Sequence, residues 1–260
     1  MTYADIQVVH DGGITRITID RPPMNAVSIG LLEELNDAFD ALVTREETRC
    51  IILGAAGAKA FSAGADLKSP GGGGADTATR FRDLGRRLLD TIETHPKPVA
   101  SAMRGWCIGG GFAIAMACDV RLASSTTKYR TADAYIGIVP SWGMSLTRLV
   151  HYIGRNRSMD MLMLGEDISA HEALDLGLVT RVFDDEVFDD EVDRIAKRLA
   201  SGAPLVFRSI KESLRAQYWE SPTAARELEV SWSERCSASE DYREGRAAFA
   251  ERRSPVFTGR

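Results

Sequence analysis

The sequence has no surplus of basic residues. Its 32 Lys and Arg residues are outnumbered by 37 Asp and Glu residues, which leaves a formal net charge of -5, and its pI is about 5.5. A protein that binds nucleic acid needs a basic patch, so this balance argues against a nucleic-acid partner. It does not exclude an anionic small ligand, because a few local cations are enough to hold phosphates.

Cysteines are few and apolar runs are short. The four cysteines form no C-x-x-C pair, so we expect neither a metal site nor a disulfide framework. Free thiols among apolar neighbours fit a reducing cytoplasm. The first residues lack the basic and apolar segments of a secretory signal, and no apolar run approaches membrane length. We therefore expect a cytoplasmic protein that does not span a membrane.

The chain contains alternating strand and helix patterns followed by a helical end. Its 260 residues, 44% of them hydrophobic, suit one large domain with an appended subdomain. This order favours an α/β core at 1–200 and a helical C-terminal subdomain at 201–260. The expected strands are 14–19, 50–53, 99–103, 119–123 and 179–183. The expected helices follow Ser28 and cover 77–94, 112–118, 144–150, 158–164, 169–176 and the chain after 186.

Two stretches of small residues are candidates for a ligand site. In 60–68, small residues would let the backbone approach a ligand, although a tight turn after a strand also explains them. Gly109–Gly111 precede an expected helix, where unpaired N–H groups could bind an anion or oxyanion. Close packing of helix on strand explains these glycines equally well. Neither stretch matches a dinucleotide fingerprint or a P-loop.

An acid and a C-terminal segment are two further candidates. Asp133 lies among aromatic and aliphatic residues, where desolvation would raise its pKa and suit it to proton transfer. A helix cap or a surface acid is the alternative. In 244–260, Phe249 and Phe257 lie among several arginines, and a solvated terminal helix is the alternative there.

Taken in order, the motifs of the chain resemble those of the crotonase superfamily, also called the enoyl-CoA hydratase/isomerase family. Each motif is modest evidence, but the ordered set covers nearly the whole chain. The motifs are R-P-P-M-N-A at 21–26, F-S-A-G-A-D-L at 61–67, K-P-V-A at 97–100, G-G-G at 109–111 with A-x-A-C-D ending at Asp119, and E-G-R-A-A-F-x-E-R-R-x-P-x-F-x-G-R at 244–260.

The resemblance implies a spiral of ββα units with a helical C-terminal trimerisation region, assembled as a homotrimer or as a hexamer of two trimers. It implies an acyl-CoA substrate, with coenzyme A as part of that substrate and no separate cofactor. The backbone N–H groups of Ala65 and Gly110 match the family's oxyanion donors, and Arg253 and Phe257 match positions that contact coenzyme A from a neighbouring subunit. The matched substrate or coenzyme A contacts are Met24, Ala26, Ala63, Asp66, Leu67, Trp142, Arg253 and Phe257.

The chain departs from the family pattern at its acids. Hydratases of the family use two glutamates, but Ala113 occupies the first position and the shorter Asp133 the second. Most members carry Pro-Gly-x-Gly near here, where this chain has Pro140-Ser141-Trp142-Gly143, and Trp142 should narrow or reshape the acyl pocket. One acid beside an oxyanion site favours double-bond isomerisation, although hydration of an enoyl-CoA stays open. The alternatives are an acyl-CoA hydrolase, a decarboxylase, a carbon–carbon lyase, or a member that only binds a coenzyme A thioester.

Overall fold

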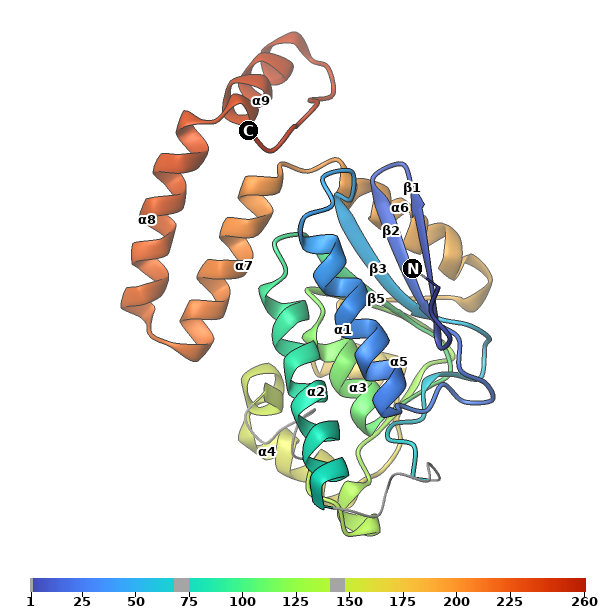
Figure 1. The fold of residues 1–260 in the computed structure, drawn as a ribbon. Coiled ribbons are helices and arrows are strands. Elements are labelled where there is room, and N and C mark those ends of the chain that lie inside the picture. Colours follow the sequence, from blue (N-terminus) through green and yellow to red (C-terminus); the bar gives the residue numbers. More distant parts are fainter. Residues whose placement is uncertain (1, 68–74, 141–147) are drawn as a thin grey trace.

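The computed structural model describes residues 2–67, 75–140 and 148–260. Strand pairs followed by a helix recur along the first half of the chain (Figure 1). These elements are β1 (Ile6–Asp11), β2 (Ile14–Ile19), α1 (Ile29–Val43), β3 (Cys50–Ala55), β4 (Ala60–Ser62), α2 (Ala75–Thr94), β5 (Val99–Met103), β6 (Trp106–Ile108), α3 (Gly109–Ala117), β7 (Val120–Ser124), β8 (Lys128–Arg130), the 3₁₀ helix η1 (Asp133–Ile136) and α4 (Arg148–Leu164).

The second half of the chain is mostly helical. Two short strands, one joining each sheet, come first with a short helix between them, and helices then follow one another to residue 251. The elements are β9 (Ile168–Ser169), α5 (Ala170–Asp175), β10 (Arg181–Phe183), η2 (Asp185–Val187), α6 (Phe188–Ala200), α7 (Pro204–Trp219), α8 (Pro222–Ala238) and α9 (Glu240–Glu251).

The strands of successive units enter two different sheets. Within the described residues, one sheet has the order β1-β2-β3-β5-β7-β10 and the other the order β4-β6-β8-β9. From β3 to β8, the first strand of each pair joins the larger sheet and the second joins the smaller one. Apart from the antiparallel end strands β1 and β9, neighbouring strands run parallel. Each of these three pairs therefore adds one strand to each sheet and advances the spiral by one step.

The larger sheet is buried on both faces, as parallel sheets usually are. In β3, Ile51 and Leu53 face one hydrophobic cluster, which includes side chains from α1, α2 and α3. Cys50 and Ile52 alternate with them and face a second cluster, which α6 covers with residues such as Val192. All four strand residues are at most 3% exposed, so β3 lies at the centre of the core.

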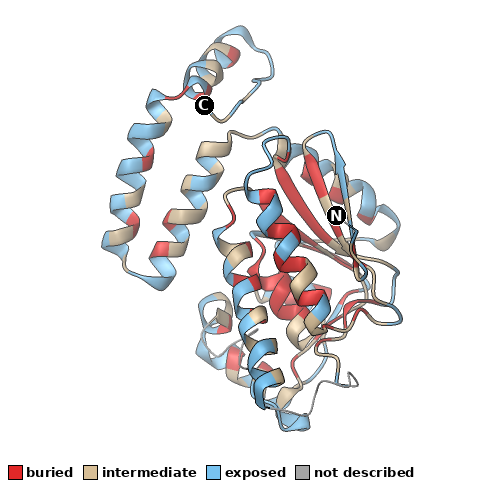
Figure 2. Cartoon of the chain, viewed as in Figure 1, coloured by how far each residue is buried: buried red, intermediate tan, exposed pale blue. Residues whose placement is uncertain are grey.

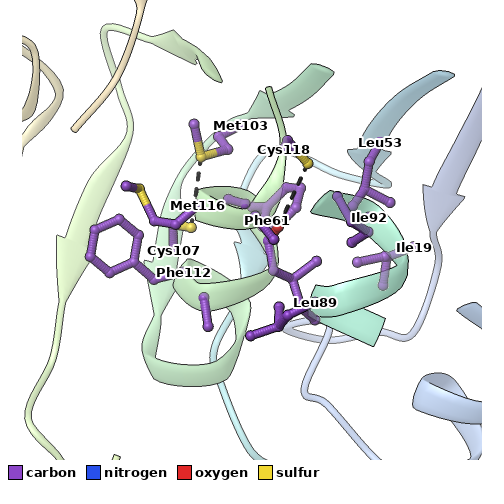
Figure 3. Close-up of a cluster of buried hydrophobic side chains, with 14 of the residues drawn as sticks. Ile19, Leu53, Phe61, Leu89, Ile92, Met103, Cys107, Phe112, Met116 and Cys118 are labelled. Carbon is purple, nitrogen blue, oxygen red and sulfur yellow. Dashed lines mark hydrogen bonds between the residues drawn. The ribbon is translucent and has the colours of Figure 1, made fainter. Parts of the chain in front are cut away.

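Helix α3 is apolar on every side and lies inside the molecule. Its residues from Gly111 to Ala117 are all buried, as expected for a helix without a polar face. Figure 3 shows side chains of α3 such as Phe112 and Met116 surrounded by residues from neighbouring strands and from α2. Because α3 is enclosed in this way, its first residue is held in a fixed place relative to the strands.

The structure confirms most of the expected elements and adds five strands. The strands at 14–19 and 99–103 have the predicted bounds. The Ser28 side chain accepts from the Leu31 N–H at 3.0 Å, and Ser169 forms the expected capping box with Glu172. The sequence analysis missed β1, β4, β6, β8 and β9, and it began α3 at Phe112 instead of Gly109.

The last three helices extend away from the sheets as an arm, α7–α9 (Figure 1). Most of its surface is exposed, in contrast to the sheets and α3 (Figure 2). The Lys211 ammonium fastens α7 to the core, because it donates to the Asp119 carboxylate at 2.7 Å and to the Ile92 and Lys97 carbonyls. The predicted boundary at 200 falls between α6 and α7, and the division into two subdomains stays a prediction.

The described residues contain no candidate for a membrane-spanning helix. None of the described helices combines the length and the apolar content that a membrane span requires.

Candidate active site

Three parallel strands of the smaller sheet end at one edge. Strand β6 pairs with β4 on one side and with β8 on the other, in register Ser62 to Cys107 and Ile108 to Arg130. Ala65 follows β4 by three residues, Gly110 lies two residues after β6, and Asp133 three residues after β8. Ligand sites of open α/β sheets lie at the carboxyl ends of their strands. The topology therefore brings the three predicted catalytic residues to the same edge.

The loop after β4 makes a close approach to the start of α3. Gly64 has φ of +83°, and a Cβ added there would lie 3.0 Å from the Ile108 carbonyl oxygen and 3.7 Å from the Gly110 nitrogen. Only glycine adopts this conformation readily and leaves room for the neighbouring backbone. The peptides of Ala65 and Gly110 are thus held near each other by backbone contact, without an intervening side chain.

The Ala65 N–H points to no protein acceptor among the described residues. Its neighbours are engaged, because the Gly64 N–H donates to Ser62 Oγ at 3.2 Å and the Asp66 N–H donates to the Val27 carbonyl at 2.9 Å. The Gly64 carbonyl accepts from the Val27 N–H at 2.7 Å. Hydrogen bonds on both sides therefore fix the Ala65 peptide while its own donor stays available to a ligand.

The Gly110 N–H is a second available donor. Gly110 is the second residue of α3, and the Ile108 cap supplies no side-chain hydrogen bond. The first N–H groups of a helix have no intrahelical acceptor and lie at the positive end of its dipole. Gly111 has the packing role, since a Cβ there would lie 2.4 Å from the Ser62 Cβ. The packing explanation of the glycine run therefore holds for Gly111, while the oxyanion role of Gly110 stays a prediction.

An ion pair ties the loop that carries Ala65 to the segment before α1. The Arg21 guanidinium donates to the Asp66 carboxylate at 2.7 Å and to the Ala26 carbonyl at 3.0 Å. The Asp66 side chain is only 14% exposed. The Asp66 carboxylate thus helps to locate Ala65, and the contact of Asp66 with coenzyme A stays a prediction.

Asn25 and Met24 complete this attachment. Asn25 is buried, adopts the left-handed conformation with φ of 52°, and donates from Nδ2 to the Ala60 carbonyl at 2.8 Å. The Met24 carbonyl accepts from the Ala63 N–H at 2.9 Å. Sequence reasoning gave Asn25 no role, although asparagine is one of the few residues that tolerate this backbone conformation.

Asp133 begins η1 and is half-buried. Burial raises the pKa of its carboxyl group, and a hydrogen bond from its own backbone N–H opposes that rise. A carboxylate with a raised pKa is a stronger base than an exposed one and is better matched to proton transfer near neutral pH. The direction of this pKa shift agrees with the desolvation expected from the sequence, and proton transfer by Asp133 stays a prediction.

A family model described as enoyl-CoA hydratase/isomerase matches residues 10–260. The chain belongs to this family. It is 34% identical over 256 residues to a probable enoyl-CoA hydratase of Bacillus subtilis, with 98% of each chain covered. It is 32% identical over 258 residues to a crotonyl-CoA hydratase of Syntrophomonas wolfei, with 99% of each covered.

Solved structures of the enoyl-CoA hydratase/isomerase family have the same fold. An enoyl-CoA hydratase from Bacillus anthracis superposes with a TM-score of 0.94 at 30% identity, covering 99% of this chain and 100% of that one. The prediction of a crotonase-like spiral is confirmed, and the chain is an enzyme of the enoyl-CoA hydratase/isomerase family.

The family's first glutamate position is apolar in this chain. Ala113 lies one helical turn after Gly110, on the same side of α3. It is 1% exposed and belongs to the main hydrophobic cluster. A methyl group can neither hold a proton nor orient a water, so this turn of α3 supplies no second acid.

The remaining predicted contacts are widely separated. Leu67 follows the Ala65 loop and is 64% exposed. Arg253 and Phe257 belong to the C-terminal segment after α9, which Figure 1 shows beside α9 at the end of the arm. The Arg253 guanidinium donates to the Glu244 carboxylate at 2.8 Å. Trp142 lies outside the described residues.

The structure does not favour nucleophilic or metal chemistry at this edge. Ser62 is buried, and its Oγ accepts from the Gly64 N–H. His10 bonds to Thr15 in the first hairpin, and His151 packs against two aromatic rings of α7. Within the ranges that the structure covers, no group of three or more His, Cys, Asp and Glu residues could hold a metal ion.

Proposed function

We propose that this protein acts on enoyl-CoA thioesters through an oxyanion site made by the Ala65 and Gly110 N–H groups, with Asp133 as proton shuttle. The observation that carries the proposal is the close approach of these two peptides at the strand edge that also bears Asp133. Coenzyme A enters as part of the substrate, and the reaction needs no separate cofactor or metal.

The proposed chemistry begins at the carbon next to the thioester. Asp133 removes a proton from C2, and the electron pair moves onto the thioester oxygen as an enolate. Two backbone donors held in place before substrate arrives stabilise that charge without reorganising, which is the usual source of a large catalytic effect. Return of the proton to C4 of a 3-enoyl chain moves the double bond to C2, next to the thioester, with no change in mass.

The missing second acid favours isomerisation. Moving a double bond needs one base that takes a proton and returns it nearby, whereas adding water also requires a group that orients the water. The buried Ala113 cannot do this. Isomerisation is therefore the reaction that the described side chains support best.

Hydration is the second candidate, and the relatives favour it. The similar proteins of Bacillus subtilis and Syntrophomonas wolfei carry the names enoyl-CoA hydratase and crotonyl-CoA hydratase. In this chain Asp133 would have to orient the water and transfer its proton without a second acid. Hydrolysis, decarboxylation, carbon–carbon cleavage and binding without catalysis are the remaining alternatives.

We further propose that the protein works in the cytoplasm as a homotrimer or as a hexamer of two trimers, with contacts through the arm. Val206, Ile210, Leu214 and Tyr218 form an exposed apolar stripe along α7, at the four-residue spacing of one helix face. Contiguous exposed apolar surface commonly marks an association site. In such an assembly Arg253 and Phe257 would contact the coenzyme A of a neighbouring subunit.

Incubation with crotonyl-CoA and with a 3-enoyl-CoA separates the candidate reactions. Conjugation of the 3-enoyl-CoA with unchanged mass is the expected result, followed by the absorbance of the conjugated thioester and by mass spectrometry. A gain of one water from crotonyl-CoA would establish hydration instead. Release of free coenzyme A or of CO2 would point to the other chemistries.

Substitution of Gly110 by proline tests the oxyanion donor. Proline is tolerated in the first turn of a helix but carries no N–H, so we expect kcat to fall by about 100- to 1,000-fold, as for loss of one oxyanion donor. Thr223→Pro, at the second residue of the exposed helix α8, is the matched control. Equal activity in the two variants would contradict the assignment of Gly110.

The pH dependence of turnover tests Asp133. Asp133 must be ionised to accept a proton, and burial raises its pKa. The value of kcat/KM should therefore rise with pH, through a pKa above the ordinary aspartate value of about 4. Asp133→Ala should abolish turnover without weakening coenzyme A binding, while Asp175→Ala on the exposed side of α5 should change neither. An active Asp133→Ala variant would remove Asp133 from the mechanism.

Light scattering on the purified protein tests the assembly. The chain has a mass of 28.4 kDa, and we expect a particle of three or six chains. Ile210→Asp places a charge in the apolar stripe and should shift the mass toward the single chain. A monomeric wild-type protein at micromolar concentration would refute the assembly proposal.

A further inference from the structure

The short segment that carries Asp133 is fastened to the end of α4 from both sides. Two residues before Asp133, Thr131 Oγ1 donates to the Met161 carbonyl at 3.0 Å. Two residues after it, Tyr135 Oη donates to the Met163 carbonyl at 2.9 Å. Both carbonyls belong to the last turn of α4, and the Met161 carbonyl also accepts from the Gly165 N–H at 3.2 Å.

The chain leaving α4 packs against the same segment. Gly165 has φ of +64°, and a Cβ added there would lie 3.1 Å from the Tyr135 ring and 3.3 Å from the Ala132 Cα. The Arg130 guanidinium also donates to the Asp167 carboxylate. Residues 130–135 therefore follow the end of α4 along their whole length.

The position of the Asp133 carboxylate depends on these attachments of the neighbouring backbone. Among the described side chains, none bonds to the Asp133 carboxylate, so its place is set by its backbone. That backbone is a single 3₁₀ turn of four residues, too short to be stable by itself. The position of the carboxylate at the strand edge thus follows from the neighbours that hold the turn.

We propose that Thr131 and Tyr135 are positioning residues for Asp133, holding its carboxylate in register with the two oxyanion donors. The proposal rests on the proposed function of Asp133 as proton shuttle. Thr131 has the larger part, because it is only 1% exposed and its hydrogen bond is shielded from water. Tyr135 is 66% exposed, so its bond competes with water and contributes less.

The chain provides a matched control for Thr131. Thr127 is also 1% exposed and donates from Oγ1 to a carbonyl, that of Met103, at 2.9 Å. The two threonines lie at opposite ends of β8, and only Thr131 is on the side of Asp133. Thr127→Val and Thr131→Val therefore remove the same kind of bond, and a purely structural effect should be similar in both.

The experiment compares kcat and KM of Thr131→Val, Thr131→Ser and Thr127→Val on the substrate that the wild-type protein turns over. Thr131→Val should lower kcat by about 10- to 100-fold, as expected when a reacting group is displaced by a fraction of an ångström to an ångström. KM should change by less than about threefold, since the loss is confined to the transition state. Thr131→Ser keeps the hydroxyl and should recover most of kcat.

The pH profile gives a readout that a structural defect would not move. A carboxylate released toward water loses the desolvation that raises its pKa, so the acid limb of kcat/KM should shift to lower pH in Thr131→Val. The limb should stay in place in Thr127→Val. Tyr135→Phe should show a smaller shift in the same direction, with Tyr3→Phe as its control, because Tyr3 donates to Asp37 far from this edge.

Titration of the Asp133 carboxyl by carbon-13 NMR measures the same displacement without turnover. The pKa should fall in Thr131→Val and be unchanged in Thr127→Val. Equal kcat and equal carboxyl pKa in the two valine variants would overturn the positioning role while leaving Asp133 as the base. Full activity of Asp133→Asn would instead refute the proposed function itself.

Discussion

The site depends on the parallel pairing of three short strands, β4, β6 and β8. Each strand has only three residues, yet their common direction makes three separate loops begin at one edge. Close backbone packing at Gly64 and Gly111 then sets the distance between the first two loops. The Gly110 N–H lies at the start of α3, and the burial of this helix keeps that N–H in place.

Electrostatic demands at this edge are met with few charges. The proposed oxyanion donors are backbone groups, and the carboxylates of Asp66 and Asp133 have a structural bond in one case and a proposed role in proton transfer in the other. Asp66 bonds to Arg21 and so fixes a loop, while burial raises the pKa of the Asp133 carboxyl group. Three of the four cysteines are buried, and burial raises the pKa of the Cys50 and Cys118 thiols to about 12, so these two are poor nucleophiles at neutral pH.

The sequence predicted the long elements well because their apolar periodicity is visible over many residues. It missed β4, β6 and β8, since three residues are too few for periodicity to distinguish a strand from a loop. Ala65 and Gly110 came from the family resemblance, and the contact between Gly64 and the start of α3 supports their pairing independently. The bond between Arg21 and Asp66 joins residues 45 positions apart, and no local pattern encodes such a partner.

The alternation of strands between two sheets also has an evolutionary consequence. Each of the three units that begin with β3, β5 and β7 places one proposed functional group after the end of its short strand, while many of the side chains that stabilise the spiral lie in the larger sheet and the helices. A substitution beyond a strand end can therefore change the chemistry without disturbing the core. The same scaffold can change an acid, as at residue 133, by a single replacement, while the proposed oxyanion donors, being main chain, persist through any change of side chain other than one to proline.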